Sequence, residues 1–158
     1  MTGRLTNLFF GIMAVLLFAV PSDAGRKVDV SSGQKVYVPV YSHIYQGPKN
    51  RPYYLSAMLS IRNVDAVNTI VVSSVKYLDD DGKIIKSFFD QPISIPPMAT
   101  KEVFIPERDT SGGSGANFIV IWEADKQVSV PIIQAVMIGT ASTQGISFVC
   151  DGVAIEEN

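Results

Sequence analysis

Apolar and polar residues alternate with a period of two along most of this chain, and this pattern constrains the fold more than any other feature. Over residues 35–45, valine and isoleucine occupy one set of alternate positions, and the other set includes Tyr37, Tyr41, His43 and Tyr45. Successive side chains of a β-strand point to opposite faces, so the pattern predicts a strand with one buried side. Pro39 cannot donate to a ladder, which favours an edge position or a β-bulge there.

The rest of the chain repeats the pattern between turn signals. Residues 53–63 alternate in the same way, and the apolar phase slips by one residue at Ser73-Ser74, which predicts a β-bulge or a change of sheet. Residues 79–82 read Asp-Asp-Asp-Gly between apolar runs, a hairpin signal. Within an expected strand over 117–123, residues 118–122 are apolar on both faces, as in a central strand. A further strand is expected over 128–138, with one side formed by Val128, Val130, Ile132, Val136 and Ile138.

These patterns predict an all-β domain over residues 35–155. About seven to nine short strands, separated by frequent turns, are typical of an antiparallel immunoglobulin-like β-sandwich, with a small β-barrel as the alternative. Residues 25–34 would form an N-terminal extension and residues 156–158 an acidic tail.

The first 24 residues have the character of a signal peptide. Arg4 precedes an apolar run from Leu8 to Val20, and small residues stand at the −3 and −1 positions of a cut after Ala24. The run is short for roughly 30 Å of hydrocarbon, so we expect cleavage and no stable membrane span, with an uncleaved anchor as the alternative. The protein would then be periplasmic or secreted.

Composition narrows the class of function. The net charge is −2 and the basic residues are scattered, so we expect no nucleic-acid partner. The chain has one cysteine and one histidine, which excludes an internal disulfide and an all-histidine metal centre. His43 and Cys150 could together contribute to a copper site only as a weak alternative, and the aspartates of 79–81 lack the later ligands of a calcium loop. The glycine-rich loop 111–115, expected to be flexible, lacks the Lys-Ser/Thr of a phosphate cradle.

Tyrosines provide the most suggestive surface. We interpret Tyr37, Tyr41, His43, Tyr45 and Tyr54 as a binding face, extended by Met58 and by the loops 111–117 and 140–144, because tyrosine gives a large contact area at low entropy cost. Burial of this face inside the sandwich is the structural alternative. No catalytic constellation and no cofactor motif is recognisable, so we expect no enzyme and no cofactor.

Several runs carry a resemblance: VYVPVYSHIY at 36–45, LSIRN at 59–63, YLDDDGK at 77–83, GANFIV at 115–120 with Trp122, VMIG at 136–139 and QGISF at 144–148. Together they resemble an exported bacterial domain family of unknown function, over about 35–153. The resemblance implies no activity and no catalytic residues.

The sequence therefore predicts a non-catalytic binding or assembly module of the cell envelope, with an unknown protein partner. Its edge strands also allow a homodimer or strand addition. A small-ligand or metal carrier is the alternative, and an enzyme of unknown type is the second alternative.

Overall fold

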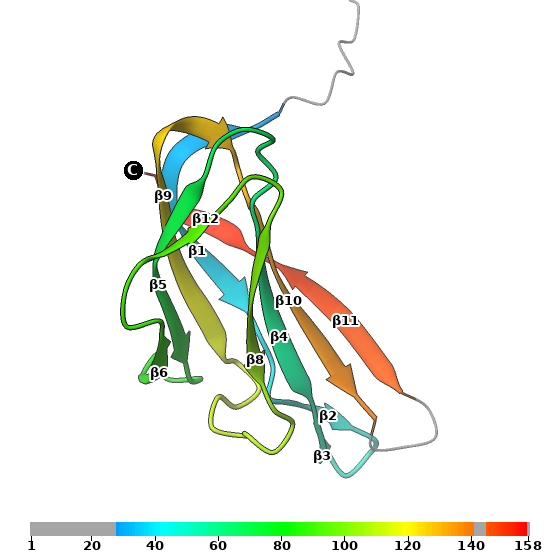
Figure 1. The fold of residues 1–158 in the computed structure, drawn as a ribbon. Helices are drawn as coiled ribbons and strands as arrows, with labels where there is room; N and C mark the ends of the chain where they lie inside the picture. The colour runs from blue at the N-terminus through cyan, green and yellow to red at the C-terminus, as the bar shows by residue number, and fades with distance from the viewer. Residues whose placement is uncertain (1–27, 141–144, 158) are drawn as a thin grey trace, which may run out of the picture.

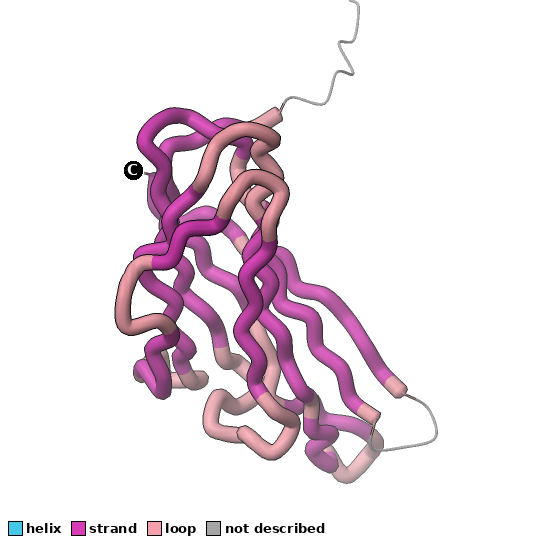
Figure 2. Tube along the Cα trace, in the orientation of Figure 1, coloured by secondary structure: helices cyan, strands magenta, loops and turns pink. Residues whose placement is uncertain are grey.

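A computed structural model describes residues 28–140 and 145–157, and this part of the chain is all-β with no helix (Figures 1 and 2). Two antiparallel sheets pack face to face, and neither closes on itself, so the predicted sandwich is confirmed. The predicted signal peptide and most of the loop 140–144 lie outside the described residues. No helix among the described residues has the length and apolar character needed to cross a membrane.

The six-stranded sheet has the order β12-β1-β9-β5-β6, with β7 also paired to β5. Its strands are β1 (Val30–Pro39), β5 (Ile70–Leu78), β6 (Ile84–Phe88), β7 (Ile93–Ile95), β9 (Asn117–Ser129) and β12 (Val153–Glu157). The four-stranded sheet has the order β11-β10-β4-β8. Its strands are β4 (Ser56–Arg62), β8 (Thr100–Ile105), β10 (Ile132–Gly139) and β11 (Ile146–Asp151). A separate hairpin consists of β2 (His43–Gln46) and β3 (Arg51–Tyr54).

The core lies between the two sheets. The six-stranded sheet contributes alternate residues of β1, β5 and β9 to the core. The four-stranded sheet contributes Leu59, Ile61, Ala135 and Met137, among others. β9 is the central strand that its apolar sequence predicts, with β1 on one side and β5 on the other. The strands extend from Val30 to Glu157, past both ends of the expected range 35–155.

The β-bulge predicted at Ser73-Ser74 is confirmed. The register between β5 and β9 shifts between Val72 and Ser74, and Ile70, Val72, Val75 and Tyr77 all remain buried. The additional residue restores the inward direction of the apolar side chains after the phase slip. The hairpin turn at 79–82 is also present, with Gly82 at φ 76° and its N–H donated to Asp79 O at 3.0 Å.

The expected single strand over 128–138 is wrong. β9 continues to Ser129, β10 begins at Ile132, and the turn between them contains Pro131. The buried side of β10 is formed by Ile133, Ala135 and Met137, whereas Ile132 and Ile138 are each 45% exposed. Both sides of this segment are apolar, so alternation alone could not identify which side is buried.

The expected single strand over 35–45 is also interrupted. β1 ends at Pro39, and Ser42 is buried with its N–H donated to Gly113 O at 2.9 Å and its carbonyl accepting Leu55 N–H at 2.9 Å. The Ser42 and Tyr77 hydroxyl oxygens are 2.9 Å apart. Through these bonds, the segment between β1 and β2 pairs with other parts of the chain instead of continuing β1 in the six-stranded sheet. β12 pairs with β1 only from Gln34 to Tyr37, so Pro39 has no strand on that side.

The loop 111–115, expected to be flexible, is attached to the sandwich. Gly115 donates its N–H to Asp80 Oδ1 at 2.8 Å, and a Cβ added to Gly112 would collide with the Tyr77 side chain. Gly113 has φ 77°, a conformation that glycine adopts without strain. The glycines thus permit close packing of the loop on Tyr77 and Asp80.

Asp65 connects its own loop to the end of β9 and makes stability depend on pH. Its carboxylate accepts N–H bonds from Val67, Asn68 and Ser129, and these bonds lower its pKa from 3.8 to about 2. Because the folded pKa is the lower one, we expect this contribution to stability to be complete above about pH 4 and lost as the pH falls toward 2. Urea unfolding between pH 2 and 6 should show a smaller decline for Asp65→Asn than for the native protein. An equal decline in both would contradict the prediction.

Candidate interaction surface

The structure divides the five residues of the predicted binding face. Tyr37 is half-buried on the outer side of the six-stranded sheet, opposite Ile119 and Val153. Tyr41 is half-buried and packs edge-on against Phe148 of β11, with ring centroids 5.7 Å apart. These two tyrosines therefore belong to different surroundings from the three residues on the hairpin.

His43, Tyr45 and Tyr54 come together on the hairpin β2–β3, and we call them the hairpin cluster. His43 pairs with Tyr54 across the hairpin, and its ring centroid lies 5.1 Å from that of Tyr45 and 6.2 Å from that of Tyr54. Tyr45 is 59% exposed and Tyr54 is 44% exposed. The buried His43 Nδ1 has no hydrogen-bond partner among the residues that the structure describes. The cluster thus offers aromatic area to solvent outside both sheets.

A row of four apolar side chains crosses the outer face of the four-stranded sheet, and we call it the apolar stripe. Its members are Val149 of β11, Val136 of β10, Met58 of β4 and Phe104 of β8, each directly opposite the next. Residues directly opposite in a ladder share a face, so the four side chains lie side by side. Phe104 is 61% exposed, Val149 is 53% exposed, and Met58 and Val136 are half-buried.

The apolar stripe continues toward the hairpin cluster. Tyr54, Ser56 and Met58 alternate with the buried Tyr53, Leu55 and Ala57, so they follow one side of the chain from β3 into β4. A surface depression is lined by Tyr54 and residues 106–108, which follow Phe104 after one residue. The two features therefore adjoin at the hairpin end of the four-stranded sheet, the lower end in Figure 1.

Polar groups border the apolar stripe. The neighbouring row of the same face holds Glu102, Ser60, Gln134 and Asp151, and Gln134 Nε2 donates to Asp151 Oδ1 at 2.7 Å. An apolar patch with a polar rim is the usual anatomy of a protein–protein interface. The arrangement can bury aromatic and aliphatic side chains against a partner while its rim stays hydrated.

The sequence identified Tyr54 and Met58, but it missed Phe104, Val136 and Val149. Val136 was grouped with Ile132 and Ile138 on one side of its strand, but the sequence did not show that this side faces outward. Phe104 stands between Val103 and Ile105, and both of these are buried. Three consecutive apolar residues in a strand force at least one outward, and this signal could have identified Phe104.

The weak metal alternative has little support from the geometry. His43 lies on the hairpin opposite Tyr54, and Cys150 lies in β11 opposite Ala135. Burial, with a smaller effect of Asp151, raises the pKa of the Cys150 thiol, which disfavours a thiolate ligand. Within 28–140 and 145–157, no group of three or more His, Cys, Asp and Glu residues could hold a metal ion.

Comparison with known proteins gives a family and no activity. A family model described as "Protein of unknown function (DUF3124)" matches residues 33–155. No curated protein matches the chain. A solved structure entitled "Crystal Structure of Thermotoga maritima 1070" is similar with a TM-score of 0.46 and 12% identity, over 79% of this chain and 97% of that one.

Proposed function

We propose a function from the interaction surface, because the chain belongs to the DUF3124 family of unknown function and that membership assigns no activity. The protein would be a non-catalytic binding or assembly module of the cell envelope, periplasmic or secreted. It would engage a protein partner through the apolar stripe and the hairpin cluster.

The apolar stripe is the observation that carries this proposal. Its four residues cross every strand of one sheet on the face opposite the core, so packing of the sandwich does not explain their apolar character. Burying apolar area on binding contributes about 25 cal/mol per Å² before the costs of association. Phe104, Tyr45 and Tyr54 would provide the aromatic anchors, a residue type enriched in the centres of interfaces.

The envelope location rests on the sequence. An apolar run ahead of a small-residue cleavage site supports export, and one cysteine suits a domain that needs no internal disulfide. We therefore look for the partner among proteins of the envelope.

Site-specific photocrosslinking tests the proposal. We place p-benzoylphenylalanine at Phe104, at Tyr45 or, as control, at Ile84, and irradiate cells that produce the full chain. Ile84 is exposed on β6 of the other sheet. The Phe104 and Tyr45 probes should give the same discrete adduct, and the Ile84 probe should not.

A second substitution links that adduct to the apolar stripe. In the Phe104 probe protein, Val149→Asp should lower the adduct yield about tenfold, because a hot-spot loss near 1.4 kcal/mol changes affinity by that factor. Val149 is exposed at an edge strand, so folding should tolerate the change. The same adducts from all three probe positions, or no adduct from Phe104, would overturn the proposal.

A further inference from the structure

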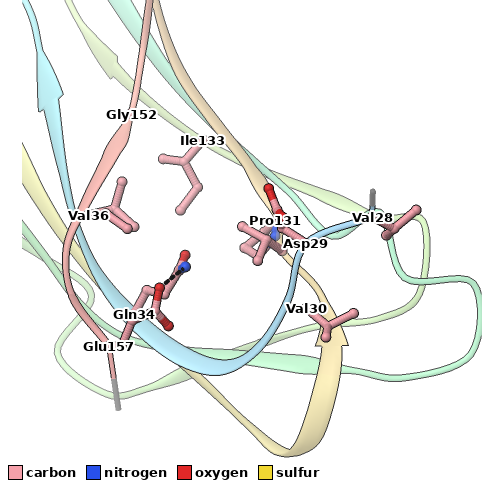
Figure 3. Close-up of a pocket in the computed structure, with 11 residues that line it drawn as sticks. Val28, Asp29, Val30, Gln34, Val36, Pro131, Ile133, Gly152 and Glu157 are labelled. Carbon is pink, nitrogen blue, oxygen red and sulfur yellow. Dashed lines mark hydrogen bonds between the residues drawn. The ribbon is translucent and has the colours of Figure 1, made fainter. Parts of the chain in front are cut away.

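A pocket of about 460 Å³ opens where β1, β12 and the turn between β9 and β10 meet (Figure 3). This turn and the hairpin cluster are at opposite ends of the sandwich in Figure 1, so the pocket is separate from the interaction surface. Its apolar walls include Val28, Val30, Val36, Pro131, Ile133 and Ala154. Three polar side chains also line it, from Asp29, Gln34 and Glu157.

The Glu157 carboxylate is held in place at this pocket. Gln34 Nε2 donates to Glu157 Oε1 at 2.6 Å, and Ser31 Oγ donates to Glu157 Oε2 at 2.8 Å. Gln34 is 6% exposed, and Figure 3 shows its amide end directed toward Ile133 across the pocket. The carbonyl oxygen of that amide takes no part in the bond to Glu157. The Glu157 carboxylate and the side-chain amide of Gln34 are therefore fixed at one wall.

The polar side chains of the pocket favour a positive charge. Asp29 adds a second carboxylate, and no Lys or Arg is among the described residues that line the pocket. Lys35 pairs with Glu156 at 2.8 Å, and Glu157 receives its bonds from neutral donors. An alkylammonium group would donate to the carboxylate and amide oxygens, and an apolar stem would contact the valine and proline walls.

We propose that this pocket binds an organic ammonium cation with a short apolar stem. A bare metal ion fits less well, since the described part of the chain has no group of three or more potential ligands for one. An anion of the same size would face two carboxylates and is excluded by charge. The inference is independent of the interaction surface.

A series of three unbranched probes with six carbons each tests the charge requirement. n-Hexylammonium, hexanol and hexanoate are titrated into the purified protein by calorimetry, with chemical shifts of pocket residues as a second readout. We expect n-hexylammonium to bind about tenfold or more tightly than hexanol, because a hydrogen bond to a charged group adds to the shared apolar contribution, and hexanoate not to bind. Equal binding of n-hexylammonium and hexanoate, or no binding of n-hexylammonium, would overturn the proposal.

Substitutions locate the site. Glu157→Gln and Asp29→Asn should each weaken n-hexylammonium binding about fivefold and leave hexanol binding unchanged, because they remove charge and keep shape. Glu102→Gln is the matched control, since it removes one carboxylate from the distant four-stranded sheet. The same loss in Glu102→Gln as in Glu157→Gln would indicate a diffuse charge effect and overturn the assignment.

Arg26 and Lys27 directly precede Val28 in the sequence, so the chain has two cations of its own that are adjacent in sequence to a lining residue of the pocket. A double variant, Arg26→Ala with Lys27→Ala, separates an internal from an external source of the cation. Tighter binding of n-hexylammonium by this variant would support the cation site. It would also indicate that a basic side chain of the protein itself occupies the site in the native protein. Unchanged binding would support the site with an external ligand.

Discussion

Replacing Trp122 by alanine should lower the free energy of unfolding by about 3–5 kcal/mol, the usual cost of truncating a large buried aromatic residue. Trp122 is fully buried in the middle of β9, opposite Gln34 of β1 and Val72 of β5. Both neighbouring strands hold it in place, so the surrounding side chains cannot collapse far into the space left behind. Because Trp122 is the only tryptophan, unfolding in urea should be followed by circular dichroism rather than by fluorescence.

Two further substitutions test the cause of that loss. Trp122→Phe should cost less, about 1–2 kcal/mol, because it leaves a smaller cavity and removes an indole N–H that has no hydrogen-bond partner in the described part of the chain. Phe104→Ala removes a comparable ring from an exposed position and should change stability by about 0.5 kcal/mol or less. A loss below about 1 kcal/mol for Trp122→Ala would contradict the position of this side chain in the core.

Period-two alternation located the buried sides of strands where most of the outward residues were polar. In residues 53–63, the five positions expected inward are all buried, and in β5 even the bulge followed from the phase slip. The same reasoning could not identify the buried side over 128–138, where Val136 and Ile138 are apolar yet face outward. Side-chain type could not distinguish the two faces there, because the outer face is itself apolar.

The candidate surface was less predictable, because it depends on which strands become neighbours. The apolar stripe draws on four strands whose order along the chain is β4, β8, β10 and β11, and no local pattern encodes their register. The aromatic residues of 36–45 looked like one face, but the bonds of the buried Ser42 separate Tyr37 and Tyr41 from the hairpin. The predicted resemblance to a family of unknown function, over about 35–153, is confirmed by the family match at 33–155.

Asn63 joins two other parts of the backbone at the end of β4. Its side chain is 2% exposed, and its Nδ2 lies 2.8 Å from Asn68 O, 3.0 Å from Ile95 O and 3.1 Å from Pro96 O. Its Oδ1 accepts the N–H of Asp65 at 3.0 Å. The amide thus provides hydrogen-bond partners for backbone groups of the loop that follows β4 and for backbone carbonyls at the end of β7.

Asn63→Leu should therefore lower the free energy of unfolding by about 2–4 kcal/mol, because it keeps the side-chain volume but leaves buried carbonyl groups without a donor. Asn63→Asp should cost at least as much at neutral pH, since it turns an acceptor toward three carbonyl oxygens, and less at low pH, where the carboxyl is protonated. Urea unfolding measures both, with the exposed neighbour Thr69→Ala as the control. A loss below about 1 kcal/mol for Asn63→Leu would mean that water replaces the amide, and the side chain would then be no structural bridge.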